Sequence, residues 1–118
     1  MADFYLDDDS HPIPKLDVID LTGARKNSGV DLFIVVASTL DADEYSQRRL
    51  LKKIENYLTY VASEEYQNEF GIPNPSQTKI VLHVRLGYHA AIGELINRCK
   101  PWVLENNAEL IVNEHKIL

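Results

Sequence analysis

The chain has 118 residues, 45% of them hydrophobic and 25% charged, a composition typical of one soluble globular domain. A formal net charge of −6 argues against binding to nucleic acid, because the long-range field repels polyanions and favours basic partners. The acidic N-terminus does not have the form of a secretory signal, and no segment approaches the roughly 20 apolar residues of a membrane span. We therefore expect a cytoplasmic protein with no membrane partner.

Residues 1–14 differ in character from the rest of the chain. They combine an acidic run, Asp7 to Asp9, with a segment from His11 to Pro14 whose two prolines resist helix and central strand. This composition predicts an N-terminal arm, extended or flexible, ahead of a single α/β domain over 15–118. For the apolar side chains of residues 4–6, docking on the parent fold is favoured over anchoring on a partner.

Two strands are expected first, over 16–21 and 30–38, joined as a hairpin by the turn-rich residues between them. The unbroken apolar run from Leu32 to Val36 indicates a strand buried on both faces, as in the centre of a sheet.

A long helix is predicted over 42–65, with Asp41 as its N-cap and Glu44 as the capping-box partner. Its apolar stripe contains Tyr45, Leu50, Leu51, Ile54, Tyr57, Leu58 and Val61, and its polar surface is expected to contain Gln47, Arg48, Lys52, Lys53, Glu55 and Asn56.

After a loop over 71–77, a third strand is predicted over 79–86, followed by a helix that starts after Gly87. Pro101 is expected to kink or interrupt that helix, since an interior proline removes a hydrogen bond. Asn106 and Asn107 mark its end, because asparagine tolerates the left-handed cap geometry. The last strand is predicted over 109–114.

The element order ββαβαβ predicts an α+β fold, a two-layer sandwich in which two long helices cover one face of a mixed four-stranded sheet. The third and fourth strands should be parallel neighbours joined by a right-handed crossover. The order of the strands in the sheet is left open.

The third strand alternates strictly. Ile80, Leu82, Val84 and Leu86 point to one face, and Val81, His83 and Arg85 point to the other. With both helices on the first face, the second is left open for contact. Ile111 and Asn113 of the last strand, or the residues that alternate with them, are expected to join it. The N-terminal arm lying across this face is an alternative.

Tyrosine supplies the other candidate contacts, because its ring buries while its hydroxyl stays paired. Tyr60 falls outside the apolar stripe of the first helix, and Tyr88 and His89 stand at the start of the second. The predicted partner-binding residues are thus Val81, His83, Arg85, Tyr60, Tyr88 and His89.

No catalytic motif is visible in the sequence. The four histidines lack the spacing of a metal site, the glycines form no phosphate-binding loop, and no serine stands in a nucleophile elbow. Cys99, the only cysteine, cannot form an intrachain disulfide and lies on an apolar helix face, where a thiol behaves as a small hydrophobe. We predict no metal, no cofactor and no enzymatic activity.

The chain resembles an uncharacterised family of small bacterial two-layer α/β proteins. The resemblance rests on Val18-Ile19-Asp20-Leu21, on Lys53-Ile54 followed by Tyr57-Leu58, and on the strand from Lys79 to Val84. It implies no established activity. In size, acidity and two-layer form the chain is also similar to immunity proteins that neutralise bacterial toxins, an analogy of fold and charge alone.

Three hypotheses follow. The first is a protein-binding module, of the immunity or antitoxin kind, that grips a basic partner through an acidic, tyrosine-rich surface. The second is a small-ligand-binding protein or enzyme with a pocket near His83, Arg85, Tyr88 and His89. The third is a structural homodimer formed through the open sheet face.

Overall fold

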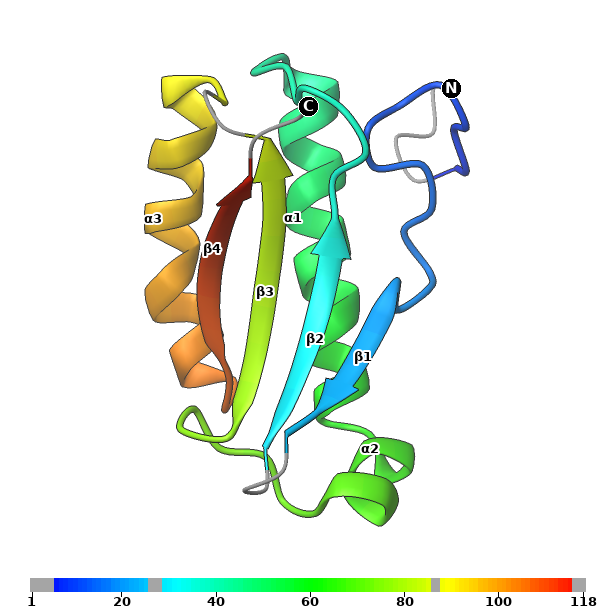
Figure 1. Cartoon of the computed structure of the whole chain (residues 1–118), viewed down its shortest axis with the longest axis vertical. Coiled ribbons are helices and arrows are strands. Elements are labelled where there is room, and N and C mark those ends of the chain that lie inside the picture. The colour runs from blue at the N-terminus through cyan, green and yellow to red at the C-terminus, as the bar shows by residue number, and fades with distance from the viewer. Residues whose placement is uncertain (1–5, 26–28, 86–87, 116–118) are drawn as a thin grey trace.

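The computed structural model in Figure 1 describes residues 6–25, 29–85 and 88–115. Its strands are β1 (Leu21–Ala24), β2 (Val30–Val35), β3 (Thr78–Arg85) and β4 (Glu109–His115), and its helices are α1 (Glu44–Val61), α2 (Glu64–Phe70) and α3 (Ala90–Glu105). The sheet order is β1-β2-β3-β4; β1 is antiparallel to β2, and β2, β3 and β4 are mutually parallel. The predicted α+β fold with a mixed four-stranded sheet is confirmed, and the short helix α2 is an addition to it.

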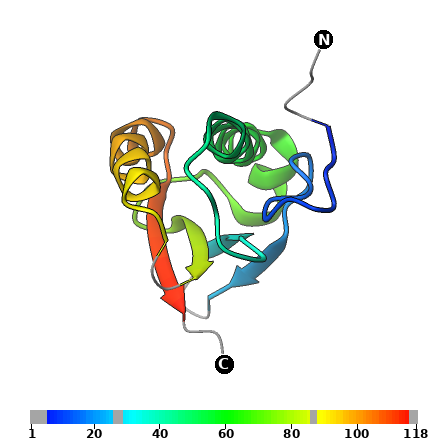
Figure 2. The same ribbon diagram turned by 90° about the horizontal axis from the view of Figure 1, so that it is seen from above.

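The long helices α1 and α3 lie side by side on one face of the sheet (Figure 2). Every second residue of β3, namely Ile80, Leu82 and Val84, is buried between the two layers. Ile54 of α1 and Ile92 of α3 are fully buried on the facing side. Because a buried aliphatic side chain stabilises a fold by about 1.5–3 kcal/mol, this layer is the main source of stability.

The first strand is shorter and later than predicted. Strand pairing begins at Leu21, and residues 16–20 form no ladder although Leu16 is buried in the core. The Asp20 carboxylate accepts the backbone N–H of Val35 at 2.9 Å, so a side chain takes the hydrogen bond that a longer strand would have supplied. The second strand likewise ends at Val35 rather than Ser38.

The predicted helix over 42–65 is wrong in its cap and in its length. Asp43, not Asp41, is the N-cap, and its side chain accepts the backbone N–H of Ser46. The helix ends at Val61, since Ser63 adopts an extended conformation and its hydroxyl caps α2 by accepting the N–H of Tyr66. A serine inside a helical pattern therefore signals a break here.

The expected interruption at Pro101 is also wrong, because α3 runs unbroken from Ala90 to Glu105 with Pro101 inside it. The proline is exposed, as is Asn97 four residues earlier, whose carbonyl loses its helical partner. The carbonyl group without a helical donor is therefore on the solvent-exposed side of α3, where water can bind it. Its predicted end is confirmed by Asn107, which has a φ of 68°.

Residues 6–20, called here the N-terminal segment, lie along α1 without regular secondary structure. Arg49 of α1 is fully buried beneath them and donates to the carbonyl oxygens of Leu6 at 2.7 Å, Ile13 at 2.6 and 2.9 Å, and Pro14 at 3.0 Å. Residues 6–14 therefore contact α1 rather than the helix-free face of the sheet, contrary to the alternative in which the arm covers it. The apolar residues Phe4 and Tyr5 of the predicted docking segment fall outside the described residues.

Lys53, one helical turn further along, holds the second half of the N-terminal segment. It is 1% exposed, which corrects its predicted place on the polar surface, and its Nζ donates to the carbonyl of Lys15, to that of Val18 at 2.9 Å and to the Asp20 carboxylate at 2.8 Å. Tyr57 continues the row, accepting the Asp20 N–H at 2.9 Å and donating to the carbonyl of Phe33. Side chains on one face of α1 thus form hydrogen bonds with backbone groups of the N-terminal segment, which has no regular secondary structure to pair them.

Replacement of Arg49 by leucine should lower the free energy of unfolding by about 3 kcal/mol, because the carbonyl groups of the N-terminal segment would stay buried without a donor. The matched control is Arg48→Leu, since Arg48 is the adjacent residue but pairs with Glu44 at the exposed surface. There the change should stay within about 0.5 kcal/mol. Urea denaturation of both variants measures the difference; equal losses would contradict the role given to Arg49.

The neutral imidazole of His11 links the N-terminal segment to α1. Its Nδ1 accepts the backbone N–H of Ile13 at 2.9 Å, and its Nε2 lies 2.9 Å from the Ser46 hydroxyl as the donor. Burial, and then the positive charge of Arg49, lower the pKa of this imidazole below its ordinary value. Nearby, hydrogen bonds from Ser10 and from the Tyr45 hydroxyl lower the pKa of Asp8 to about 2.

The lowered pKa of His11 predicts a loss of stability in weak acid. As the pH falls below the ordinary value of 6.5, the unfolded chain binds a proton that the folded chain refuses, so the free energy of unfolding declines. His11→Asn should flatten this decline between about pH 7.5 and 5.5, since asparagine can accept the same N–H two residues on but does not titrate. Thermal unfolding across this range measures it.

His89→Asn is the matched control. His89 also accepts the N–H two residues on, from Ala91 at 3.1 Å, but its side chain is exposed. The pH dependence should persist in this variant. An unchanged slope in His11→Asn, or the same flattening in both variants, would refute the assignment.

Candidate functional site: the open sheet face

The face of the sheet opposite α1 and α3 is covered by no helix in the described part of the chain (Figures 1 and 2). We call it the open face. Strand alternation and register place on it Leu21 and Gly23 of β1, Asp31, Phe33 and Val35 of β2, Lys79, Val81, His83 and Arg85 of β3, and Glu109, Ile111 and Asn113 of β4. The outward direction predicted for Val81, His83 and Arg85 agrees with the burial of their alternate neighbours on the core side.

An apolar row crosses all four strands of this face. Leu21 pairs with Phe33, Phe33 with Val81, and Val81 with Ile111 in the strand register. Leu21 is 57% exposed, Ile111 37% and the adjacent Val35 41%, whereas Val81 in the middle is covered by its neighbours. Contiguous exposed apolar patches are contact surfaces more often than scattered single apolar residues are.

Gly23 gives the row its shape. A Cβ atom built at Gly23 would lie 3.5 Å from the edge of the Phe33 ring, an ordinary van der Waals distance, so the ring lies next to the glycine. Phe33 is half-buried in this position. An aromatic ring presents a large apolar surface for binding.

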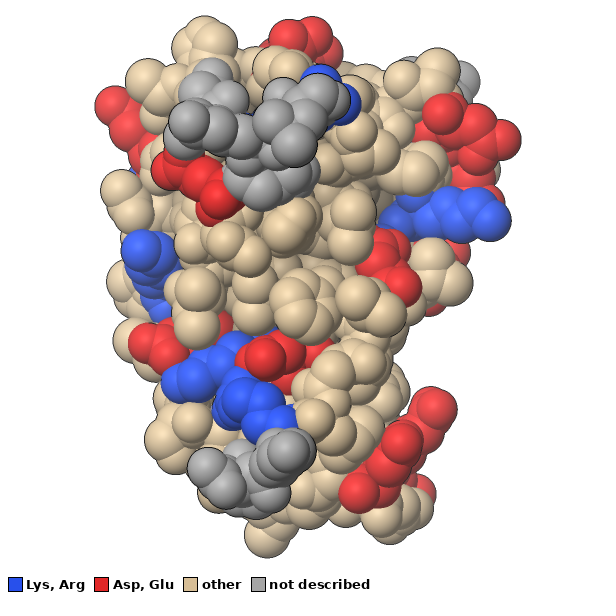
Figure 3. Space-filling view, in the orientation of Figure 1, with Lys and Arg blue, Asp and Glu red and all other residues tan. Residues whose placement is uncertain are grey.

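A charged row runs beside the apolar one. Arg25, just after β1, forms an ion pair with Asp31 and donates to the carbonyl of Gln77 at 2.8 Å. Lys79 pairs with Glu109 and donates to the carbonyl of Pro75 at 2.7 Å. Figure 3 shows a band of side chains of both charges across the lower part of this face, below a centre that is free of charged side chains. The open face thus has an apolar centre and, along one side of it, a row with equal numbers of positive and negative side chains.

At the other end of the face, His83 and Asn113 interact across β3 and β4. The Asn113 amide nitrogen lies 3.2 Å from His83 Nδ1, so the amide donates and Nδ1 accepts. Arg85 follows at the end of β3, half-exposed. This end can offer hydrogen bonds of both kinds to a partner.

The other three predicted residues lie elsewhere. Tyr60 is on α1, where its ring packs edge-on against Tyr66 at 5.6 Å between centroids, and burial raises its pKa. Tyr88 lies against Gly93 of α3, and His89 is the N-cap of that helix. The six predicted residues therefore do not form one surface, and the tyrosines of the described residues are buried or half-buried in packing contacts.

Sequence reasoning missed Leu21, Phe33 and Val35, which complete the apolar row. In β2 both faces are apolar, so the run from Leu32 to Val36 shows no alternation and indicates burial on both sides. The structure places Val35 in an exposed position instead. The composition of β2 signalled a central strand, which is correct, but only the placement of the helices reveals that one of its faces is uncovered.

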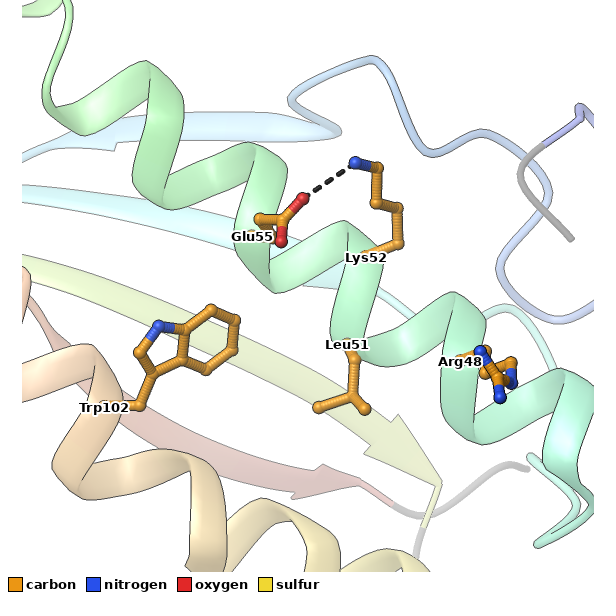
Figure 4. A pocket seen from close by; sticks show the side chains of 5 residues that line it. All are labelled: Arg48, Leu51, Lys52, Glu55 and Trp102. Atoms are coloured by element: carbon orange, nitrogen blue, oxygen red, sulfur yellow. Dashed lines mark hydrogen bonds and ion pairs between the residues drawn. The ribbon is translucent and has the colours of Figure 1, made fainter.

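A separate groove lies in the helix layer, between α1 and α3 on either side of Trp102. One hollow of about 480 Å³ is lined by Arg48, Leu51, Lys52, Glu55 and Trp102 (Figure 4). Another, of about 590 Å³, is lined by Glu55, Leu58, Thr59, Ala62, Ser63, Trp102 and Asn106. Lys52 and Glu55, which line the first hollow, form an ion pair at 2.7 Å. Neither hollow is lined by His83, Arg85, Tyr88 or His89.

Reactive groups in the described residues do not converge. Cys99 is buried on α3, and burial raises the pKa of its thiol, which disfavours the nucleophilic thiolate. Across residues 6–25, 29–85 and 88–115, no three His, Cys, Asp or Glu side chains gather as a metal site would require. Over the same ranges, no helix is long and apolar enough to cross a membrane.

The fold and its open face define a small two-layer α+β protein with a helix-free sheet surface. Residues 12–116 match the family model DUF6572, a family of unknown function, and the chain belongs to this family. The expected membership in an uncharacterised family is thereby confirmed. No curated protein and no solved structure matches the chain significantly.

The two faces of the sheet predict different losses of stability when adjacent residues of β4 are replaced. Leu110 is 3% exposed toward the helices and Ile111 is 37% exposed on the open face. Leu110→Ala should lower the free energy of unfolding by about 2–4 kcal/mol, because it leaves a cavity in the core, and Ile111→Ala by less than about 1 kcal/mol. Chemical denaturation of the two variants tests this. A loss at Ile111 as large as at Leu110 would mean that the open face is part of the core.

Proposed function

We propose that this chain is a non-enzymatic protein-binding module and that the open face is its binding surface. The observation that carries the proposal is the apolar row from Leu21 to Ile111, which is contiguous, crosses the whole sheet and is left exposed at both ends. Burial of apolar area drives most protein association, and a small apolar centre with a polar rim is the usual composition of an interface.

The rim fits this function as well. Charges of both signs alternate there and are already paired, so they add selectivity without a large desolvation cost for the apolar centre. His83 and Asn113 add hydrogen-bonding groups on the opposite side of the row. A flat sheet surface of this kind favours another protein over a small molecule, because small ligands bind in concave sites.

An immunity-type role would place a basic partner on an acidic surface instead. The open face has balanced charge, whereas α2 exposes Glu64, Glu65 and Glu69 away from it. Charge reversal in α2 would therefore abolish binding of such a basic partner, whereas substitutions at Ile111 would leave that binding unchanged. The small-ligand hypothesis predicts a rise in melting temperature with a metabolite that contacts His83 or Arg85.

Photo-crosslinking in living cells tests the proposal directly. With benzoylphenylalanine at position 111, we expect covalent adducts with protein, because this side chain stands on the open face. The matched control carries the same group at Ile72, which is 83% exposed but lies in the loop after α2. It should give few adducts. Equal labelling at both positions, or none at 111, would refute the assignment of the open face as the binding surface.

A further inference from the structure

The charged row of the open face has a regular order. Asp31, Lys79 and Glu109 are register partners in β2, β3 and β4, and Arg25, just after β1, joins this row through its ion pair with Asp31. The sign of the charge therefore alternates across the sheet from Arg25 to Glu109. The ion pairs within the chain join the first two members and the last two. When such a row is reversed end to end, every positive group takes the place of a negative one.

A two-fold axis parallel to the strands, between β2 and β3, performs that reversal. It brings β1 of one copy over β4 of the other and β2 over β3. Asp31 then faces Lys79 of the other copy, and Arg25 faces Glu109. In the apolar row, by the same operation, Phe33 faces Val81 and Leu21 faces Ile111.

The alternative axis, in the plane of the sheet but perpendicular to the strands, gives no such match. With this axis through the middle of the face, each strand would lie opposite the same strand of the other copy, in the reverse direction. Asp31 would then face Val35 of the other copy, and Lys79 would face its His83. Asp31 would then lose water opposite an apolar side chain, and Lys79 would face an imidazole in place of a carboxylate. The pattern on the face thus selects one of the two simple arrangements.

We propose that the partner of the open face is a second copy of this chain, stacked face to face about a two-fold axis parallel to the strands. This rests on the proposed function, since it names the occupant of that surface. Two stacked sheets with nearly aligned strands are a common packing, and a two-fold interface must be self-complementary, as this one is.

The net charge of −6 opposes association of two copies, but it does not reside on this face. The charged row contains two cations and two anions, and Arg85 adds a further cation at the end of β3. Repulsion between the remaining acidic groups is screened beyond about 8 Å at physiological ionic strength. The local match therefore outweighs the global repulsion.

The size of the face sets the strength of the dimer. Four strands span about 19 Å across, and the rows used extend for roughly 20 Å along them. A face of this size buries less than the roughly 1,200–2,000 Å² of total area that stable interfaces bury, so we expect a weak, reversible association. Sedimentation velocity over about 5 to 500 μM should show a shift from monomer to dimer.

A charge exchange between two variants tests the arrangement itself. In Asp31→Lys the central positions of the row are both positive, and in Lys79→Glu both are negative, so each variant alone should dimerise roughly tenfold more weakly or worse. An equimolar mixture should recover dimer, because each lysine of the first variant then faces a carboxylate of the second. Circular dichroism confirms that both variants are folded, and the recovery in the mixture shows that the loss is not due to misfolding.

Ile111→Asp should also abolish the dimer, whereas Ile72→Asp, away from the face, should not. A wild-type chain that stays monomeric throughout, or variants that do not recover on mixing, would overturn the two-fold arrangement. If the purified chain is monomeric while position 111 still crosslinks to another protein in cells, the second copy is excluded and the protein-binding function stands. If position 111 crosslinks to nothing, both proposals fail.

Discussion

Two buried cations on one face of α1 hold the N-terminal segment against the helix layer. Arg49 and Lys53 are at most 1% exposed, and each ends on backbone carbonyl groups of the N-terminal segment. A charge without water or partners is costly inside a protein, and so is a buried carbonyl without a donor. The carbonyl groups accept hydrogen bonds from the two cations, and the cations donate the hydrogen bonds that the buried carbonyl groups need. The segment is therefore ordered by α1, and residues such as Ile13 and Leu16 can enter the core without belonging to a helix or strand.

The same arrangement explains why one face of the sheet is uncovered. The N-terminal segment follows α1 and joins the helix layer, and α3 completes that layer beside it (Figure 2). The parallel connections from β2 to β3 and from β3 to β4 both cross on that side. In residues 6–25, 29–85 and 88–115 no helix remains for the other side, so the apolar row of the open face is left without a cover. Its exposure is a consequence of topology.

The proposed function thus assigns stability and recognition to opposite sides of the sheet. The core side contains the large buried side chains, and the open face contains an apolar centre, paired charges and the His83–Asn113 contact. This separation lets the open face change with little effect on folding, because its side chains add little to the core. Neither of the two hollows between α1 and α3 is lined by residues of the open face.

The sequence by itself determined the element types, the hairpin, the parallel pair formed by β3 and β4, and the outward direction of Val81, His83 and Arg85. These follow from local periodicity and from the handedness of crossover connections, which neighbouring residues encode. Only the tertiary structure decided that Lys53 is buried, that Tyr60 and Tyr88 lie away from the open face, and that Phe33 and Val35 are on it. The reason is physical: a cation enters the core only when distant carbonyls meet it, and a strand that is apolar on both faces does not record which face its helices will cover.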